Sequence, residues 1–483
     1  MEFNIPEMKR SVLLVLVAAA LFPQCGKVGK NKGVSEFASV CQTSTGKPVG
    51  VVMTTYTTTM LADGKDRTLI RACVVDSAGR EITTANVPVT ISVTGDAIIA
   101  GTKNGIPVLL VKSENSTKVW SSKIVEGSCT FIFQAGTRPD KIKVEVKSDS
   151  IWPGSHEIHT INPDVKLLKP SKEQIKPFTK KIGRSIGADI SFLPQMESRG
   201  MKFYENGEEK DLIKILADHG FNYIRLRVFV NPENEKGYSP ITGFCGLEYT
   251  KQMAARAKKY GMKLLLNFHY SDYWADPQQQ NKPLAWKDLD FNLLKDSLKA
   301  YTKRVLIALR DQGTLPEMVQ VGNEINHGML WPDGHISNLD NLAELLKAGV
   351  EGVREIDPSI VIMMHLALGG QNREATFWLD NMISRGVDFD MIGLSYYPRW
   401  HGTLDDLKSN LNDLAVRYNK DLNVVEYSQF KKEVHDIVFS LPDNRGEGTF
   451  IWESINSFFD KTGNPTKELA GYDEISKQYL HNQ

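Results

Sequence analysis

The chain has 483 residues, more than one ordinary hydrophobic core accommodates and enough for a large domain with a smaller one. Its 58 basic and 58 acidic residues give a formal net charge of zero, which excludes broad electrostatic attraction to nucleic acid or to an anionic membrane. The 41% hydrophobic and 9% aromatic content is typical of a well-packed globular protein rather than of a disordered chain.

The N-terminus has the features of an export signal. Lys9 and Arg10 precede the apolar run 12–22, which is too short to span a membrane, and Cys25 follows soon after. This order resembles a bacterial lipoprotein signal with Cys25 as the lipid-bearing residue, although the residues just before Cys25 are larger than in most such signals. The alternative is a secreted protein cut by ordinary signal peptidase. We expect residues 1–25 to be a signal peptide and the mature chain to be secreted or held at the cell surface, as an outer-membrane lipoprotein.

The next two segments are a tether and an all-β domain. Residues 26–47 are rich in Gly, Lys and Ser, which favours a flexible tether. Residues 48–162 contain short alternating runs separated by turn residues, which predict about seven strands in an antiparallel sandwich. Segments 62–66 and 74–80 resemble bacterial Ig-like modules, and without an aromatic platform or acidic cluster we expect a spacer. The clearest expected strands are 68–75, 87–93, 128–134 and 141–146.

The second domain shows alternating strands and helices. Pro and Lys residues mark 163–180 as a linker, and eight apolar runs of strand length then alternate with amphipathic helical patterns, predicting a (β/α)₈ barrel over residues 181–483. A doubly wound open sheet is the alternative, but no glycine-rich phosphate loop follows the first strand, which also argues against a nucleotide cofactor. The expected strands are 185–189, 223–227, 263–268, 318–322, 361–365, 391–395, 423–425 and 449–452.

Two acidic residues follow expected barrel strands. Glu324 comes after the fourth strand and Glu426 after the seventh, and an unpaired buried carboxylate is too costly to serve as core filler. Either acid could instead be a structural ion-pair partner of Arg225 or Arg227. The fourth and seventh strands lie across the mouth of a barrel, where catalytic side chains collect. Two carboxyl groups about 5–5.5 Å apart are what a retaining glycosidase requires, so we predict both acids to be catalytic.

Polar and aromatic residues at the other strand ends are expected to line the site. Asn323 fits a hydrogen bond to a sugar 2-hydroxyl, and Trp400 and Trp452 offer aromatic faces on which sugar rings stack. No ligand pair has the spacing of a metal site, so no metal is expected. The residues predicted to bind substrate are Asp189, Arg227, His269, Asn323, His365, Tyr396, Trp400 and Trp452.

Six longer stretches are more specific than the Asn-Glu pair. They are 187–191, 225–228, 268–277, 320–325, 392–398 and 448–453. Together they resemble the arabinogalactan endo-β-1,4-galactanases of glycoside hydrolase family 53. The resemblance implies cleavage within β-1,4-galactan, the pectic side chain, with retention of configuration and release of galacto-oligosaccharides. It implies that Glu324 is the acid/base and Glu426 the nucleophile.

The sequence departs from the family after the seventh strand. Family members carry a small residue there and then a long loop, in some bacterial enzymes with acidic calcium ligands, whereas residues 427–432 lead almost at once into a helix. We therefore expect no calcium site and a cleft that is more open on this side. We also expect a monomer without cofactors. One alternative is a xylanase or mannanase of the same clan, which the stretches around His269 and Tyr396 oppose. Another is a non-catalytic sugar-binding surface lipoprotein, which the presence of both acids opposes.

Overall fold

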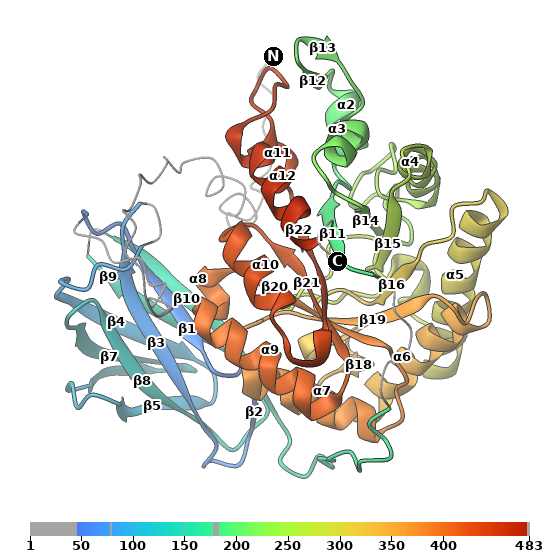
Figure 1. Ribbon diagram of the computed structural model, residues 1–483. Coiled ribbons are helices and arrows are strands. Elements are labelled where there is room, and N and C mark those ends of the chain that lie inside the picture. The colour runs from blue at the N-terminus through green and yellow to red at the C-terminus, as the bar shows by residue number, and fades with distance from the viewer. Residues whose placement is uncertain (1–45, 78–79, 150, 177–182, 481–483) are drawn as a thin grey trace, which may run out of the picture.

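The computed structural model describes residues 46–77, 80–149, 151–176 and 183–480, which form an all-β domain and a barrel domain (Figure 1). The expected signal peptide, Cys25 and most of the expected tether lie outside the described residues. Within the described ranges, no helix is both long enough and apolar enough to cross a bilayer.

The N-terminal domain is a β-sandwich of ten strands in one continuous sheet. The strand order is β5-β8-β3-β1-β10-β9-β4-β7-β6, with β2 pairing β10. Most pairs are antiparallel as predicted, but β1 and β2 each run parallel to β10. The bounds are β1 Gly50–Thr55, β2 Thr59–Leu61, β3 Arg67–Val75, β4 Val87–Thr94, β5 Ala97–Thr102, β6 Leu109–Glu114, β7 Thr117–Ile124, β8 Ser128–Ala135, β9 Asp140–Ser148 and β10 Ile151–Ile161.

Alternating side chains build the sandwich core. Every second residue of β8 is buried, including Phe131 and Phe133, as expected for a strand with one face inside. The edge strand β6 is exposed along its whole length, so its sequence lacks the alternation that identifies a strand. The predicted count of about seven strands was therefore too low.

Eight parallel strands close the second domain into a barrel. Six of them begin at the predicted residue, because their apolar runs are buried on both faces. Gly187 is required inside, because a Cβ there would lie 2.1 Å from a ring carbon of Phe450. In order around the barrel, the strands are β11 Ser185–Asp189, β14 Tyr223–Val228, β15 Lys263–Phe268, β16 Met318–Val321, β19 Val361–Leu366, β20 Met391–Tyr396, β21 Asp421–Tyr427 and β22 Gly446–Ile451.

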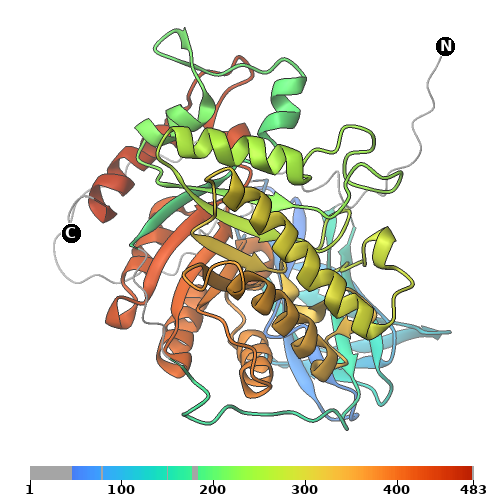
Figure 2. The same cartoon turned by 90° about the vertical axis from the view of Figure 1, so that its right-hand side faces the viewer.

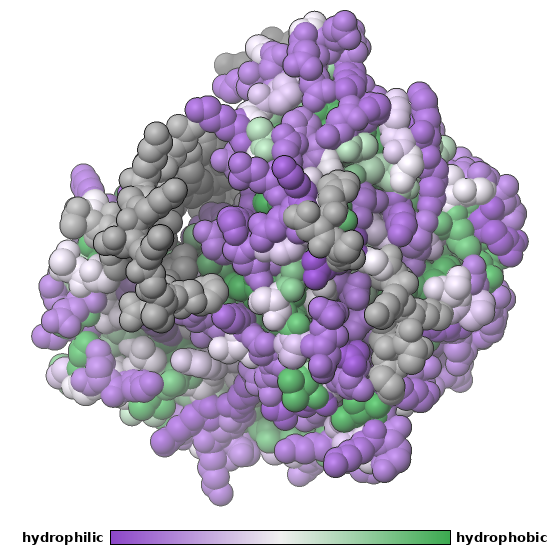
Figure 3. Space-filling view, viewed as in Figure 1, coloured by the Kyte–Doolittle hydropathy of each residue, from purple (hydrophilic) through white to green (hydrophobic). Residues whose placement is uncertain are grey.

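Helices surround the barrel, and α4, α5 and α6 lie side by side on its outside (Figure 2). The helices are α2 Leu193–Ser198, α3 Leu212–Asp218, α4 Leu247–Lys259, α5 Phe291–Asp311, α6 Leu339–Arg354, α7 Asn372–Ser384, α8 Pro398–His401, α9 Leu404–Tyr418, α10 Lys431–Phe439, α11 Ile455–Phe458 and α12 Lys467–Tyr479. Short pieces are the 3₁₀ helices η1 Leu284–Trp286, η2 Ile325–His327 and η3 Pro442–Asn444 and the two-residue strands β12 Tyr204–Glu205, β13 Glu208–Glu209, β17 Gly328–Met329 and β18 Gly334–His335. The face in Figure 3 is mostly hydrophilic, with scattered apolar patches.

The sandwich packs directly against the barrel. Figure 1 shows β1 and β10 beside α8, and β1 contacts that helix. The turn Thr57–Thr59 surrounds the carboxylate of Glu374 on α7, which is 2% exposed. The hydroxyl of Thr58 also lies 2.9 Å from Nε2 of His327, the last residue of η2, which follows Glu324 directly. The all-β domain is therefore docked beside the carboxyl ends of the barrel strands, and its expected role as a spacer stays a prediction.

Candidate active site

A tight turn presents Glu324 at the mouth of the barrel. Strand β16 ends at Val321, and Gly322 follows with φ of 95°, where a Cβ would lie 2.6 Å from Cγ2 of Ile325. Glu324 itself adopts a left-handed conformation with φ of 48° before η2 begins. A non-glycine residue in that region stores strain of about 1–3 kcal/mol, a feature that clusters at functional sites. The turn leaves the Glu324 side chain half-buried and directed into the site.

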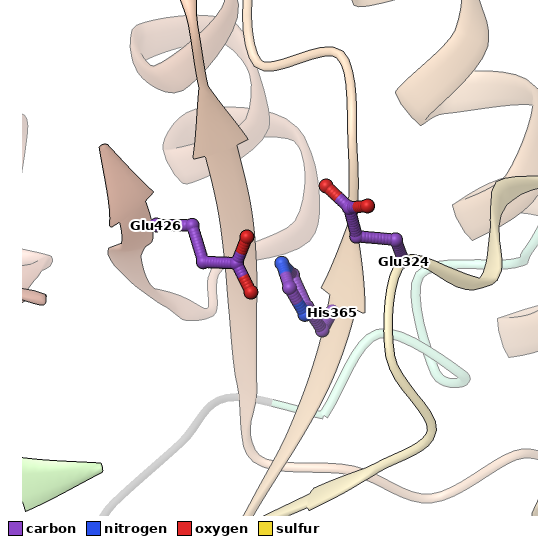
Figure 4. Close-up of side chains that lie close together, drawn as sticks. All are labelled: Glu324, His365 and Glu426. Carbon is purple, nitrogen blue, oxygen red and sulfur yellow. The ribbon is translucent and has the colours of Figure 1, made fainter. Parts of the chain in front are cut away.

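Glu324 and Glu426 face each other across the barrel mouth. Figure 4 shows the two carboxyl groups on either side of the ring of His365, which comes from β19. One oxygen of each glutamate and one ring nitrogen of His365 all lie within 4.8 Å of one another. Retaining glycosidases separate their carboxyl groups by about 5–5.5 Å and inverting ones by about 6.5–9.5 Å. The spacing matches the retaining arrangement that was predicted.

Arg225 holds Glu426 in place. Its Nη2 lies 2.8 Å from Oε1 of Glu426, its Nη1 donates to Oδ2 of Asp189 at 2.9 Å, and its Nε donates to Oε1 of Gln320 at 2.8 Å. The guanidinium is 1% exposed, so these ion pairs are shielded from water. The hydroxyl of Tyr397 donates to the other oxygen, Oε2 of Glu426, at 3.1 Å. Glu426 thus has a cation and a hydroxyl donor that stabilise its ionised form.

Glu324 has a different electrostatic environment. Burial raises its pKa to about 8, and the negative charge of Glu426 acts in the same direction. Burial also raises the pKa of Glu426, but the contact with Arg225 opposes that rise. Because two carboxylates this close repel each other, the pair retains one proton near neutral pH, and that proton resides on Glu324.

A chain of polar side chains lies beneath the two acids. Oδ1 of Asn323 accepts hydrogen bonds from Nη2 of Arg225 at 3.2 Å and from Nδ2 of Asn267 at 2.8 Å, and lies 3.1 Å from Nδ1 of His365. Nε2 of His365 lies 2.8 Å from Oγ of Ser395, which in turn lies 2.6 Å from Oε1 of Glu324. Burial, together with the positive charge of Arg225, keeps the pKa of His365 well below its ordinary value, so the ring is neutral.

Aromatic rings form a continuous wall at the mouth. The ring centroids of Trp274 and Trp452 are 6.5 Å apart, those of Trp452 and Tyr397 are 6.1 Å apart, and those of Tyr397 and Trp400 are 6.2 Å apart. All four side chains are partly exposed. Partly exposed indole and phenol faces next to paired carboxylates suit the stacking of sugar rings.

The prediction of Tyr396 as a substrate-binding residue is corrected by its position. Its side chain is fully buried, and its hydroxyl donates to the carbonyl oxygen of Gly402 at 3.3 Å. Tyr396 lies on the same face of β20 as Ile392 and Leu394 and packs with them in the main hydrophobic core, because side chains alternate along the strand. The neighbouring residue Tyr397 faces Glu426 instead.

Four other predicted site residues lie behind the surface of the site. Arg227 is stacked between the rings of Phe192 at 3.9 Å and Trp274 at 4.3 Å, and so supports the aromatic wall from behind. The ring of His269 accepts a hydrogen bond from the amide of Ala275 through Nδ1 at 3.1 Å. Asp189, Arg227, His269 and His365 are all buried, and so are three other predicted residues, Tyr396, Asn323 and Glu426. Burial alone does not separate these four residues from Asn323 and Glu426, so their role in substrate binding stays a prediction.

The structure also places Arg225, Ser395, Tyr397 and Glu453 at the site. Arg225, considered above as an ion-pair partner of either acid, lies within β14 and pairs with Glu426. The other three lie at or just after the end of a barrel strand, which is the signal that could have identified them. Glu453 directly follows Trp452 with φ of 48°. Burial raises its pKa to about 7, while the positive charge of Arg227 opposes the rise.

One group of three metal-ligating side chains occurs among the described residues, and it consists of Glu324, His365 and Glu426. Both ring nitrogens of His365 already have hydrogen-bond partners, so the ring offers no lone pair without disruption of that network. The group is explained by the paired acids, and the expected lack of a calcium site stays a prediction.

A closed barrel of parallel strands with facing glutamates after its fourth and seventh strands defines a glycoside hydrolase of the retaining type. The chain belongs to glycosyl hydrolase family 53, whose family model matches residues 185–437. The sandwich is matched separately, over residues 51–157, by the model of glycoside hydrolase family 2 C-terminal domain 5.

Individual relatives match the barrel domain. An uncharacterised protein of Niallia circulans is 45% identical over 310 residues, which cover 56% of this chain and 82% of that one. The arabinogalactan endo-beta-1,4-galactanase of Humicola insolens is 36% identical over 301 residues, which cover 55% of this chain and 88% of the relative. The solved family 53 catalytic domain of Ignisphaera aggregans is 32% identical with a TM-score of 0.58, and the match covers 62% of this chain and 98% of that structure.

Proposed function

We propose that the protein is a retaining endo-β-1,4-galactanase that cleaves within the β-1,4-galactan side chains of pectic arabinogalactan type I and releases galacto-oligosaccharides. The observation that carries the proposal is the facing pair of Glu324 and Glu426, with oxygens within 4.8 Å, in a chain of family 53. The galactanase name of the Humicola insolens relative supports the choice of substrate.

The first chemical step divides the work between the two acids. The carboxylate of Glu426 attacks the anomeric carbon, while Glu324 donates its proton to the glycosidic oxygen. The C–O bond to the leaving sugar breaks, and a glycosyl ester forms on Glu426. The assignment follows from the environments, because Glu426 contacts the guanidinium of Arg225 and Glu324 has the raised pKa of a proton donor.

The second step returns the enzyme to its starting state. Formation of the ester removes the charge of Glu426, so the pKa of Glu324 falls and the ionised Glu324 accepts a proton from water. The resulting hydroxide oxygen attacks the anomeric carbon and displaces Glu426. One water molecule is consumed, Glu324 regains its proton, and the configuration at the anomeric carbon is retained.

We assign substrate binding to the aromatic wall and to Asn323. The partly exposed rings of Trp400, Trp452 and Tyr397 are placed to stack on successive sugars. The Nδ2 of Asn323 uses one hydrogen for the carbonyl of Ala275 at 2.8 Å, which leaves its second hydrogen for the 2-hydroxyl of the sugar at the cleavage point.

The test is incubation with potato galactan and analysis of the released sugars. We expect the wild type to release oligosaccharides, and Glu324→Gln and Glu426→Gln each to reduce the rate by roughly a hundredfold or more. The matched control is Glu474→Gln, which removes an exposed carboxylate on α12 and should leave the rate unchanged. Activity on xylan or mannan alone would replace galactan as the substrate, and sugar binding without hydrolysis would establish a non-catalytic protein.

We also propose that the protein acts as a monomer at the cell surface or outside the cell, with Cys25 as a lipid attachment residue. The charged and apolar run before Cys25 supports this location. Expression with an alkyne-labelled fatty acid tests it, since the wild type should incorporate label and Cys25→Ser should not. Light scattering of the mature protein measures its mass in solution, and a mass of twice the chain would contradict the monomer.

A further inference from the structure

The amide of Asn323 has only one orientation that satisfies its neighbours. Arg225 has no acceptor, so the atom that faces its Nη2 at 3.2 Å must be the amide oxygen. On the other side, the carbonyl oxygen of Ala275 can only accept, so the atom 2.8 Å away must be the amide nitrogen. Oδ1 of Asn323 is therefore an acceptor, and each atom that approaches it must bring a hydrogen.

This orientation fixes the tautomer of His365. Its Nδ1 lies 3.1 Å from Oδ1 of Asn323 and must carry a hydrogen. The ring is fully buried, with Arg225 nearby, so the second nitrogen, Nε2, does not carry a hydrogen as well. A bare Nε2 accepts, so it must receive a hydrogen from Oγ of Ser395 at 2.8 Å.

A serine hydroxyl has one hydrogen, and that of Ser395 is donated in the hydrogen bond to Nε2 of His365. The remaining contact of Oγ of Ser395 is Oε1 of Glu324 at 2.6 Å, so a hydrogen in this contact must come from the carboxyl group. We infer that Ser395 and His365 are positioning residues that hold the catalytic proton on Glu324, through donation from Glu324 to Ser395, from Ser395 to His365 and from His365 to Asn323. The inference rests on the proposed role of Glu324 as the acid/base.

The network predicts a direction for the pKa of Glu324. When Glu324 ionises, the serine hydrogen cannot serve both the carboxylate and Nε2, so one buried hydrogen bond is lost and the proton is held more tightly. The other groups that face Glu324 act independently of this effect. They are Glu426 on β21 and Asp276 in the loop after β15, which both raise its pKa, and Arg225 on β14, which lowers it. A hydrogen bond from the Ser395 hydroxyl to the ionised carboxylate would also lower this pKa, and the donation from Ser395 to His365 withholds that bond.

The kinetic test is the pH dependence of kcat/KM on galactan for Ser395→Ala. The alkaline limb reports the proton on Glu324 in the free enzyme. We expect the alkaline limb of Ser395→Ala to lie at a lower pH than that of the wild type, by about one pKa unit. A water molecule that replaces the hydroxyl has two hydrogens, so it can donate to His365 and to the ionised Glu324 at the same time. If Ser395 instead donates to an ionised Glu324, its removal will raise the pKa of Glu324, and the alkaline limb will shift to higher pH. An upward shift, or no shift, overturns the inference.

Ser185→Ala is the matched control, since Ser185 is equally buried but lies at the opposite end of the barrel. Its pH profile should equal that of the wild type. The second measurement needs neither turnover nor a folded variant of Ser395. Nitrogen NMR of the histidine-labelled wild type, assigned with His365→Gln, should show a neutral His365 with its hydrogen on Nδ1. A hydrogen on Nε2, or a charged ring, overturns the inference. Failure of the proposed function would appear separately, as a wild type that releases no sugar from galactan.

Discussion

Replacement of Glu374 by alanine should destabilise the docking of the two domains. Its Oε2 accepts from Oγ1 of Thr57 at 2.6 Å and from the amides of Thr58 and Thr59 at 2.9 and 3.1 Å. Its Oε1 accepts from the hydroxyls of Thr58 and Thr59 at 3.2 and 3.0 Å. All of these groups are buried, and the carboxylate of Glu374 is their partner from the α7 helix. Two of the donors have a second contact, since the hydroxyl of Thr58 lies 2.9 Å from Nε2 of His327 and the amide of Thr59 donates to Oγ1 of Thr57 at 3.2 Å.

The expected loss follows from the donors left behind by Glu374→Ala. A buried hydrogen-bonding group without a partner costs about 1–3 kcal/mol. The backbone amide of Thr58 would be left without a partner, and that of Thr59 would keep only its 3.2 Å contact with Oγ1 of Thr57. The three hydroxyls can rotate towards other acceptors, and the removal of a buried charge offsets part of the loss. We therefore expect the free energy of unfolding to fall by about 3–4 kcal/mol.

Urea denaturation followed by tryptophan fluorescence measures this loss. The transition at the lowest urea concentration reports the separation of the two domains. The control is Glu474→Ala, which removes an exposed carboxylate and should change the free energy of unfolding by less than about 0.5 kcal/mol. If Glu374→Ala and Glu474→Ala have equal effects, the interface is not held by this carboxylate, and the reasoning from buried donors is refuted.

Three further predictions concern charge and protonation. Arg225→Lys cannot keep the contacts to both Asp189 and Glu426, so kcat/KM on galactan should fall roughly a hundredfold, and a loss below tenfold would contradict this role. Tyr397→Phe removes a donor to Glu426, so the acidic limb of kcat/KM should move to higher pH, and a downward shift would exclude the hydrogen bond. Burial lowers the pKa of His335 from its ordinary value of 6.5 to about 4. Between pH 6.5 and pH 4, His335 is therefore protonated in the unfolded chain and neutral in the folded one. Stability should therefore decline over this window by up to about 3 kcal/mol for this residue, and thermal melts of His335→Asn should show a shallower decline.

The barrel could be predicted because its strands are buried on both faces. Strands such as β15 and β19 appear in the sequence as continuous apolar runs, and their first residues were identified correctly. The two glutamates could be found for the opposite reason, since a carboxylate at the end of such a run needs an explanation. The exposed edge strand β6 has neither signal, and it was missed.

Another feature depends on contacts that no local pattern encodes. The docking of the sandwich joins Thr57 to Glu374, which are 317 residues apart in the chain. Neither residue is unusual in its own segment, so the buried interface becomes visible only when both domains are placed.

The roles of the two catalytic glutamates are determined by residues outside the pair. The guanidinium of Arg225 is held by Asp189 and Gln320, and these contacts leave its Nη2 against Glu426. Glu324 has only the hydroxyl of Ser395 against Oε1, and no ion pair of Glu324 occurs among the described residues. Exchange of the two roles would therefore require Arg225 to leave Asp189 and Gln320, which would cost both of these buried groups their contacts with the guanidinium. The assignment of nucleophile and proton donor thus follows from the position of one buried cation on β14.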